Sequence, residues 1–473
     1  MKKGQTSFVD LFSRFALSIA GFATNLYIAN KLGSGPLGTY FLALTLISWG
    51  ALFGNLGVQE SVKKRLSEAS SSWGHVSTGF LVQSFLYIIL SILIIVFSEE
   101  VNQYVGFQIA RLLVLMLGIQ LLFDFEAAVL EGSKRVHLSS LLNPLWWVGR
   151  SVLQISLLAL GIGLVGLFWG YLIAGTITVL AGFYLIGFKW EIPSRSHFRS
   201  IVSFAKYSWI RPIKGRAFDS MDTVVLGFFV TNNLIGVYGI TWNLASVLSI
   251  FGVSISKTLF PEISELASKG EFEEVRKMVS AALSYAGLFL IPGIIGAALL
   301  GESLLKIYGD GFSIGYSILL ILTVARLLGS FETQLTNTLD AIDHPDASFR
   351  VHSVFIVLNL TLNVVLVSQF GWIGAAVATT ATAFVSLVLA YRALTDFVEV
   401  RIPFREISKQ LLSALIMGAV VYVGKLTFGD SLFVSLLLVG VGSSIYFGIL
   451  VTISGQFRRT IQTNLPQGLK HIF

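Results

Sequence analysis

The chain has 473 residues, of which 54% are hydrophobic and only 12% are charged. A globular protein carries about a quarter charged residues, so this chain has too little polar surface to stay soluble in water. Lipid is the alternative solvent, which predicts an integral membrane protein. The net charge of +7 would suggest a nucleic-acid partner in a soluble protein. Here the basic residues lie in short loops between apolar runs, so membrane topology explains them and we expect no nucleic acid.

The sequence contains no cysteine, which excludes disulfides, thiolate catalysis and cysteine-ligated zinc. Its six histidines lie far apart along the chain, and no pair has the spacing of metal ligands. We therefore expect no metal site and no cofactor.

Apolar runs of about 20 residues, the length that crosses a hydrocarbon core, recur along the chain with short polar breaks. The first six predicted helices are Ser7–Ala29, Leu37–Leu56, Val76–Phe97, Ile109–Leu130, Leu138–Leu160 and Leu164–Ile186. The next six are Phe204–Val230, Leu234–Ile255, Met278–Leu300, Ile314–Leu339, Val351–Val367 and Ile373–Tyr391. Two more follow at Leu411–Tyr422, which we expect to extend beyond those bounds, and Leu432–Ile453. The sequence thus predicts an all-α polytopic protein with about fourteen transmembrane helices.

The distribution of Lys and Arg between alternate loops predicts the orientation. One set of loops holds about 22 of the 33 basic residues: Lys2, Lys3, Lys63, Lys64, Arg65, Lys134, Arg135, Lys189, Arg195, Arg199, Lys257, Lys269, Arg276, Lys277, Arg350, Arg392, Arg401, Arg405, Lys409, Arg458, Arg459 and Lys470. The other loops hold about three, namely Lys31, Lys306 and Lys425. Basic loops stay in the cytoplasm, so we expect both termini to be cytoplasmic in a multi-pass protein of the cell membrane.

A weak internal repeat divides the predicted helices into two sets of six. Gly38-Thr39-Tyr40 opens the second helix and Gly236-Val237-Tyr238 opens the eighth, at an offset of 198 residues. Six helices per half give both halves the same orientation, as in parallel repeats. We expect an N-terminal lobe at 1–190 and a C-terminal lobe at 200–395. Two extra helices at 405–455 and a cytoplasmic tail at 456–473 would follow.

Several segments together resemble a known family. They read ANKLGSGPLGTYFLALTL at 29–46, GVQESVKKRLSE at 57–68, KTLFPEISELASKGEFEE at 257–274, KIYGDGFSIGYSILLILTVARLLGS at 306–330 and LNVVLVSQFGWIGAAVATT at 362–380. Their order over residues 5–395 resembles the polysaccharide transporter family, the Wzx-like flippases of lipid-linked oligosaccharides. That family belongs to the multidrug/oligosaccharidyl-lipid/polysaccharide exporter superfamily, together with the MATE drug exporters and the MurJ lipid II flippases.

The resemblance implies a two-lobed helical bundle with a cleft that opens alternately to each side of the membrane. Its substrate would be a polyprenyl phosphate or pyrophosphate that carries an oligosaccharide, moved from the cytoplasmic to the outer leaflet for surface polysaccharide or glycoprotein assembly. Such a protein is not an enzyme. Coupling to Na⁺, H⁺ or the membrane potential would drive it, and a glycan polymerase or oligosaccharyltransferase would be its partner.

Ionisable residues inside predicted spans are the candidates for the substrate path, because each is costly unless it faces a cavity or a partner. The seventh predicted helix carries most of them, and Arg211, Lys214, Asp219 and Asp222 fall within about a 140° arc at 100° per residue. Arg216 points away from most of this stripe. Arg211 and Lys214 are the predicted phosphate-binding groups. The alternative is a span that begins near Ala217, with the basic residues on an interfacial helix.

Other spans add further candidates. The predicted cleft residues outside the seventh helix are Arg14, which can pair with Asp10, and Asn25, Asn55, Arg150 and Arg326. Asp124, Glu126 and Glu332 are candidates for binding a coupling ion. Interfacial placement of the first two, and buried ion pairs or helix packing for Arg150, Arg326 and Glu332, are the alternatives.

Two other functions fit parts of the sequence. A cation-coupled exporter of drugs or organic cations would favour acidic and aromatic residues along its path, and the seventh helix does carry acids. A membrane glycan polymerase or transferase would need a sizeable outer loop for its catalytic groups, whereas no predicted outer loop exceeds about 15 residues. The flippase is the function that the sequence favours.

Overall fold

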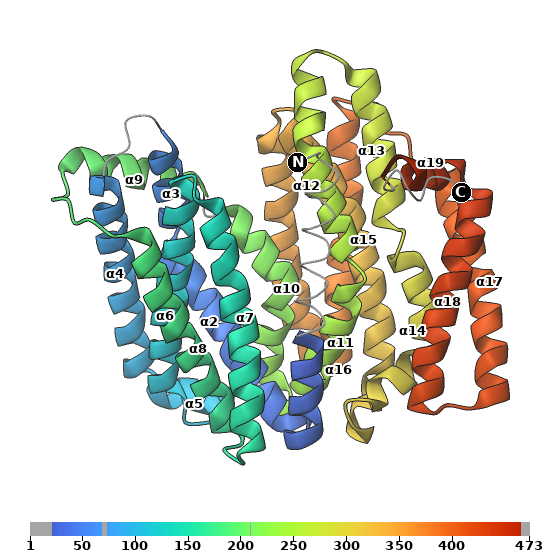
Figure 1. The fold of residues 1–473 in the computed structure, drawn as a ribbon, viewed down its shortest axis with the longest axis horizontal. Helices are drawn as coiled ribbons and strands as arrows, with labels where there is room; N and C mark the ends of the chain where they lie inside the picture. Colours follow the sequence, from blue (N-terminus) through green and yellow to red (C-terminus); the bar gives the residue numbers. More distant parts are fainter. Residues whose placement is uncertain (1–20, 69–72, 209, 465–473) are drawn as a thin grey trace. The chain divides into compact units, whose positions relative to one another are not determined.

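The computed structural model describes residues 21–68, 73–208 and 210–464, and every regular element in these ranges is helical (Figure 1). The described residues form two compact units, which divide within one helix between Gly239 and Ile240. We call residues 21–239 the N-terminal unit and residues 240–464 the C-terminal unit, and we describe each by itself. The predicted lobes at 1–190 and 200–395 stay a prediction.

The N-terminal unit contains a helical stretch at 21–32 and the nine helices α2–α10. They are α2 (Ser34–Asn55), α3 (Val58–Ser67), α4 (Trp73–Val96), α5 (Ser98–Val105), α6 (Ala110–Gly132), α7 (Val136–Ala159), α8 (Leu164–Ile186), α9 (Arg195–Ser208) and α10 (Ile210–Phe229). The boundary between the units falls in α11 (Asn232–Val247).

The C-terminal unit contains the remaining helices. They are α12 (Ile250–Ser268), α13 (Phe272–Ala286), α14 (Leu290–Lys306), the 3₁₀ turn η1 (Asp310–Gly315), α15 (Tyr316–Ala341), α16 (Pro345–Thr395), α17 (Phe404–Phe428), α18 (Leu432–Ile453) and α19 (Gly455–Asn464).

Glycine and apolar run length account for where several helices end. α8 and α18 have the predicted bounds, because each is a continuous apolar run between turn residues. The two predicted helices at 351–391 form the single element α16, broken at Gly371, where φ is 58°. Glycine is suited to this break because it alone adopts positive φ without a steric penalty. A 48° bend separates α11 from α12, so the predicted eighth span is two helical pieces.

Within the described ranges, nine helical segments are long and apolar enough to cross a membrane, or ten if the bent pair α11 and α12 is one span. α4 shows why lipid must surround these helices. Its most apolar 18-residue stretch has a mean hydropathy of 2.5, and only 11% of that stretch is buried inside the protein. Such a surface would aggregate in water but is stable in hydrocarbon. The prediction of an all-helical polytopic membrane protein is confirmed, while the count of about fourteen spans stays a prediction.

The two helices after α16 dock on α14. Leu288, Leu300, Ala414, Met417 and Tyr446 are buried in one apolar cluster between α14, α17 and α18. The Tyr446 hydroxyl donates to the Leu288 carbonyl at 2.8 Å, which satisfies the polar atom of this buried side chain. α17 and α18 are therefore an integral part of the C-terminal unit.

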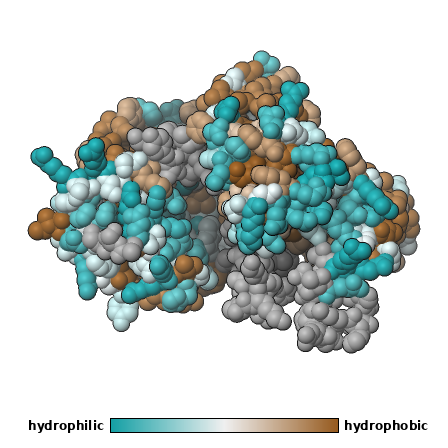
Figure 2. Space-filling view, turned by 90° about the horizontal axis from the view of Figure 1, so that it is seen from above, coloured by the Kyte–Doolittle hydropathy of each residue, from teal (hydrophilic) through white to brown (hydrophobic). Residues whose placement is uncertain are grey.

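Polar side chains gather at the helix ends. Figure 2 looks onto the ends that carry α3, α9 and the turn between α12 and α13, and hydrophilic residues dominate this surface of each unit. Lys63 and Lys269 belong to it, with side chains 43% and 53% exposed. In each unit, the distribution of basic residues predicts that these helix ends are cytoplasmic.

The two glycines of the internal repeat contact each other within the N-terminal unit. A Cβ added to Gly38 of α2 would collide with the Asn232 carbonyl, and one added to Gly236 of α11 would collide with the Ser34 carbonyl. The Asn232 side chain also donates to Thr39 Oγ1 at 2.7 Å and to the Val105 carbonyl at 2.9 Å. The absence of two side chains therefore lets α2 and α11 meet at backbone distance.

Candidate functional site

A chain of polar side chains crosses the N-terminal unit from α7 to α6. The Arg150 guanidinium on α7 lies 4.4 Å from the Trp147 ring centre and 5.6 Å from that of Tyr171 on α8. The Tyr171 hydroxyl donates to Gln120 Oε1 at 2.8 Å, and Gln120 Nε2 donates to Asp124 Oδ1 at 3.0 Å. Each group lies inside an apolar helix, so the contacts offset the cost of removing it from water.

Arg216 of α10 continues this chain to α2. It is half-buried and interacts electrostatically with Asp124. Its Nε donates to the Ser48 carbonyl at 2.8 Å, while the neighbouring Ser220 accepts a hydrogen bond from Trp49 at 3.0 Å. We call Arg150, Tyr171, Gln120, Asp124 and Arg216 the polar chain.

The predicted stripe on the seventh helix is divided by the fold. Lys214 is half-buried, with its ammonium 5.9 Å from the Phe218 ring centre, whereas Asp219 is exposed. Asp222 is buried and accepts a hydrogen bond from the buried Tyr238 hydroxyl. Asp222 therefore joins α10 to α11 in addition to being a candidate for the substrate path.

The roles of three predicted cleft residues, Arg14, Arg211 and Asn25, stay predictions. Arg14 and Asp10 lie outside the described residues, and so does the side chain of Arg211. Asn25 is half-buried in the first helix.

Asn55 has a structural contact. Its Oδ1 accepts from the Gln59 backbone N–H at 2.8 Å, at the point where α2 turns into α3. This hydrogen bond satisfies one of the free N–H groups at the start of α3. Its role in substrate binding stays a prediction.

Glu126, predicted as a coupling-ion candidate, lies on α6 with no exposed surface. Neither carboxyl oxygen has a hydrogen-bond partner among the described residues. If Glu126 lay at the membrane interface, which is the alternative given by the sequence analysis, we would expect its side chain to be accessible to lipid headgroups. Asp124, two residues earlier, is half-buried and belongs to the polar chain.

The C-terminal unit holds a second cation inside its helices. Arg326 on α15 lies over the Trp242 ring of α11 at 3.9 Å and donates to Ser246 Oγ. One and a half turns further along α15, the buried Glu332 lies 3.7 Å from His352 Nδ1 on α16. Arg326 thus contacts α11, and Glu332 lies beside α16.

Amides of α16 pack its two halves together. Asn359 donates to Thr379 Oγ1 at 3.1 Å across the Gly371 break, and Asn363 donates to the Asn359 carbonyl at 3.0 Å. Both amides are fully buried. The Asn359–Thr379 bond joins the two halves, as a helix-packing role requires, while the Asn363 bond stays within the first half.

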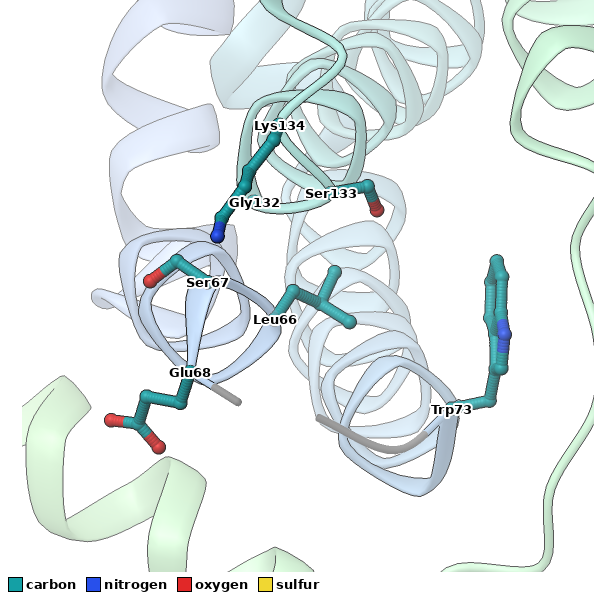
Figure 3. A pocket seen from close by; sticks show the side chains of 7 residues that line it. All are labelled: Leu66, Ser67, Glu68, Trp73, Gly132, Ser133 and Lys134. Atoms are coloured by element: carbon teal, nitrogen blue, oxygen red, sulfur yellow. The ribbon is translucent and has the colours of Figure 1, made fainter. Parts of the chain in front are cut away.

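A surface pocket lies at the ends of α3, α4 and α6, with a volume of about 330 Å³ (Figure 3). Leu66, Ser67 and Glu68 line one side, Trp73 another, and Lys134 extends toward Ser67. None of the predicted site residues lines it. The pocket borders residues 69–72, which the structure does not describe, so we assign it no function.

Sequence reasoning missed three members of the interior polar contacts: Gln120, Tyr171 and Trp242. The signal available for Gln120 was its position four residues before Asp124, which places both on one face of a helix. Arg216 was noted but assigned away from the stripe, because a single-helix wheel cannot show that α2 and α6 lie on that side.

Comparisons with known proteins agree on the family. The model of the family described as polysaccharide biosynthesis protein matches residues 32–313, more than half of the chain. The probable flippase AglR of Haloferax volcanii is 30% identical over 475 residues, which cover 99% of each chain. The probable low-salt glycan biosynthesis flippase Agl15 of the same organism is 28% identical, covering 90% of this chain and 89% of its own.

Solved structures agree on the fold. The lipid II flippase MurJ, in an inward closed conformation, gives a TM-score of 0.80 at 18% identity over 95% of this chain and 99% of its own. An inward-facing multidrug resistance MATE family transporter of the MOP superfamily gives 0.66 at 15% identity, over 80% and 95%. The family model matches more than half of this chain, and a 30% identical relative matches it almost end to end. This chain therefore belongs to the polysaccharide biosynthesis protein family, the Wzx-like polysaccharide transporters that its sequence segments resemble.

Proposed function

We propose that this protein is a flippase that moves a polyprenyl-(pyro)phosphate-linked oligosaccharide from the cytoplasmic to the outer leaflet. The observation that carries the proposal is the match to the probable flippase AglR over 99% of both chains. The relative named for low-salt glycan biosynthesis supports a glycan as the cargo. The transport step makes and breaks no covalent bond.

The arginines inside the helices suit this cargo. A phosphate that crosses hydrocarbon must exchange its water shell for fixed donors, and guanidinium offers paired N–H groups in the geometry of phosphate oxygens. Arg150 is the best placed of them, since its buried Nε has no partner among the described residues. Stacking on Trp147 and Tyr171 holds the group without using its N–H donors.

Arg216 and Arg326 extend the proposed phosphate path in their respective units. Arg216 interacts electrostatically with Asp124 and donates through Nε to the Ser48 carbonyl, and Arg326 is held over Trp242. Arg14, Arg211 and Lys214 stay in the proposal as further phosphate contacts. Asn25, Asn55, Asp219 and Asp222 stay as polar contacts to the head group.

Several features of the proposal rest on the sequence alone. Both termini would lie in the cytoplasm, and no metal or organic cofactor would take part. Na⁺, H⁺ or the membrane potential would drive the cycle, with Asp124, Glu126 and Glu332 as candidate ion ligands. A glycan polymerase or oligosaccharyltransferase would receive the flipped substrate.

Loss of the protein in its own host tests this function. Lipid-linked oligosaccharide should accumulate, and a non-permeant lectin should fail to bind it on intact cells but bind it after permeabilisation. Outer-surface glycans should fall at the same time. Normal glycans together with new sensitivity to organic cations would instead support an exporter of organic cations and contradict the flippase.

A further inference from the structure

Glu126 occupies a space that the neighbouring helix leaves for it. Its side chain on α6 has no exposed surface and lies directly against Gly182 of α8. A Cβ on residue 182 would overlap the carboxyl group, with its Cδ only 2.7 Å away. The carboxyl is therefore enclosed in helix packing, and both of its oxygens lack a hydrogen-bond partner among the described residues.

In the described part of the chain, α6 packs on α2, α3, α4, α5, α7 and α8, and no cation of these helices forms a hydrogen bond with the Glu126 carboxyl. α2 and α8 contain no charged residue, and α5 contains only acids. α3, α4, α7 and α6 itself carry the remaining charged and histidine residues. Besides Glu126, these are Glu60, Lys63, Lys64, Arg65, His75, Arg111, Asp124, Glu131, His137 and Arg150.

Three members of that set, on α3, α6 and α7, have contacts of their own. Lys63 bonds Glu131 at 2.7 Å, and Asp124 accepts from Gln120. The Arg150 guanidinium stacks on Trp147. An ionised carboxylate without a partner is far more costly to bury than a neutral acid. The enclosure at Gly182 therefore requires the neutral form.

We propose that Glu126 binds a proton when α6 and α8 are packed at Gly182 and releases it when they separate, so that transport is coupled to H⁺. The assignment rests on the flippase function proposed above and adds the ion and the residue that binds it. Sodium is a poor fit, because it needs several oxygen ligands at once. No group of three or more His, Asp or Glu in the described ranges is placed to hold a metal ion.

The proton itself can be tested without any substrate. Thermal unfolding midpoints of the purified protein are measured from about pH 5 to about pH 9, a range that includes documented buried glutamic acids. The folded form holds a neutral acid that ionises on unfolding, so the wild-type midpoint should fall with rising pH relative to that of Glu126→Gln. Glu131→Gln, on the same helix but in an accessible ion pair, should keep the wild-type slope.

Two results would overturn the proposal at this stage. One is the same pH slope for Glu126→Gln and the wild type. The other is a Glu126→Gln protein that fails to fold, since an amide of the same shape should replace a neutral acid but not a paired carboxylate.

Coupling is then tested in proteoliposomes with a fluorescent polyprenyl-phosphate-linked sugar and an imposed pH gradient. The gradient should speed wild-type and Glu131→Gln flipping at least several-fold and leave Glu126→Gln unaffected. Wild-type flipping that ignores the gradient would overturn the coupling. If the wild type moves no glycolipid at all, the flippase function fails, while the pH dependence of unfolding still decides whether Glu126 carries the proton.

Discussion

Three half-buried guanidinium groups in this protein contact aromatic rings or a backbone carbonyl. Arg150 stacks on Trp147, Arg326 lies over Trp242, and Arg216 donates to the Ser48 carbonyl. Cation–π contacts stabilise the charge while leaving the N–H groups in the plane of the guanidinium open to an anion. At Arg150, where the ring of Trp147 contacts the guanidinium, we expect a phosphate to bind the N–H groups directly.

Replacing Arg150 with glutamine should weaken binding of a polyprenyl phosphate to the purified protein by about tenfold, the loss of about 1.4 kcal/mol expected for one charge-assisted contact. Arg150→Lys should recover only part of this affinity, because lysine lacks the planar fork. Lys134→Gln at the surface pocket is the matched control and should bind normally. Equal affinity of Arg150→Gln and the wild type would remove Arg150 from the phosphate path.

Gly182→Ala should destabilise the protein by about 1–3 kcal/mol, because the new methyl group overlaps the Glu126 carboxyl. In a Glu126→Ala background the same change should cost much less, since the overlapping group is gone. Chemical unfolding of the four proteins in this cycle measures the coupling. Additive effects would show that the two residues do not share a space.

At the scale of helices, small residues decide how closely neighbours approach. α2 and α11 meet at Gly38 and Gly236, and Gly239 leaves room for the Phe41 ring one turn further on. In lipid, helices gain little from burying apolar side chains, so close backbone contact and interhelical hydrogen bonds supply much of the association. The Asn232 bonds to Thr39 and to the Val105 carbonyl are placed at this same contact.

Gly38→Ala should therefore lower stability by about 1–3 kcal/mol, because its Cβ would meet backbone that cannot rotate away. Gly440→Ala in α18 is the matched control: no atom lies within 4 Å of its added Cβ, so helix propensity should make it neutral or slightly stabilising. Thermal unfolding in one detergent compares them. A Gly38→Ala protein as stable as the control would mean that α2 and α11 can separate without cost.

Helix positions were more predictable than helix partners. α8 and α18 could be bounded from the sequence because a lipid-crossing run is set by its own hydropathy. The start of the seventh predicted span, placed at Phe204, was harder to predict, because helical residues precede it in α9 (Arg195–Ser208) and follow it in α10 (Ile210–Phe229). The Ser61 hydroxyl of α3 donates to the Ile201 carbonyl of α9, a contact between helices that the sequence does not reveal.

The candidate site was predictable in residue type but not in pairing. Arg150 and Arg326 stand out because charge inside an apolar run is rare. Their ring partners Tyr171 and Trp242 do not stand out, since aromatic residues are common throughout this chain. Glu126 and Asp124 lie two residues apart and are equivalent candidates in the sequence. In the fold, Glu126 faces α8 with no hydrogen-bond partner among the described residues, whereas Asp124 accepts a hydrogen bond from Gln120. Facing helices, which a single sequence does not reveal, make that difference.

At the scale of the whole molecule, the apolar outer faces and the polar helix ends define a membrane protein whose orientation is set by basic loops. Lys269 lies in the turn between α12 and α13, and Asp430 lies in the turn between α17 and α18. Their side chains are 53% and 63% exposed, so neither turn is enclosed by the protein. The positive-inside distribution predicts that the first turn lies in the cytoplasm and the second outside.

Because the chain contains no cysteine, single cysteines can report this orientation without background. An impermeant maleimide applied to intact cells should label Asp430→Cys and not Lys269→Cys, since only the outer turn meets the reagent. Permeabilised cells supply the control, where both positions should react to a similar extent because both side chains are exposed. Labelling of Lys269→Cys on intact cells, with Asp430→Cys protected, would reverse the orientation. The basic ends of the helices would then face the outer leaflet. Relative to the protein, the proposed glycolipid movement would run toward the basic helix ends and not away from them.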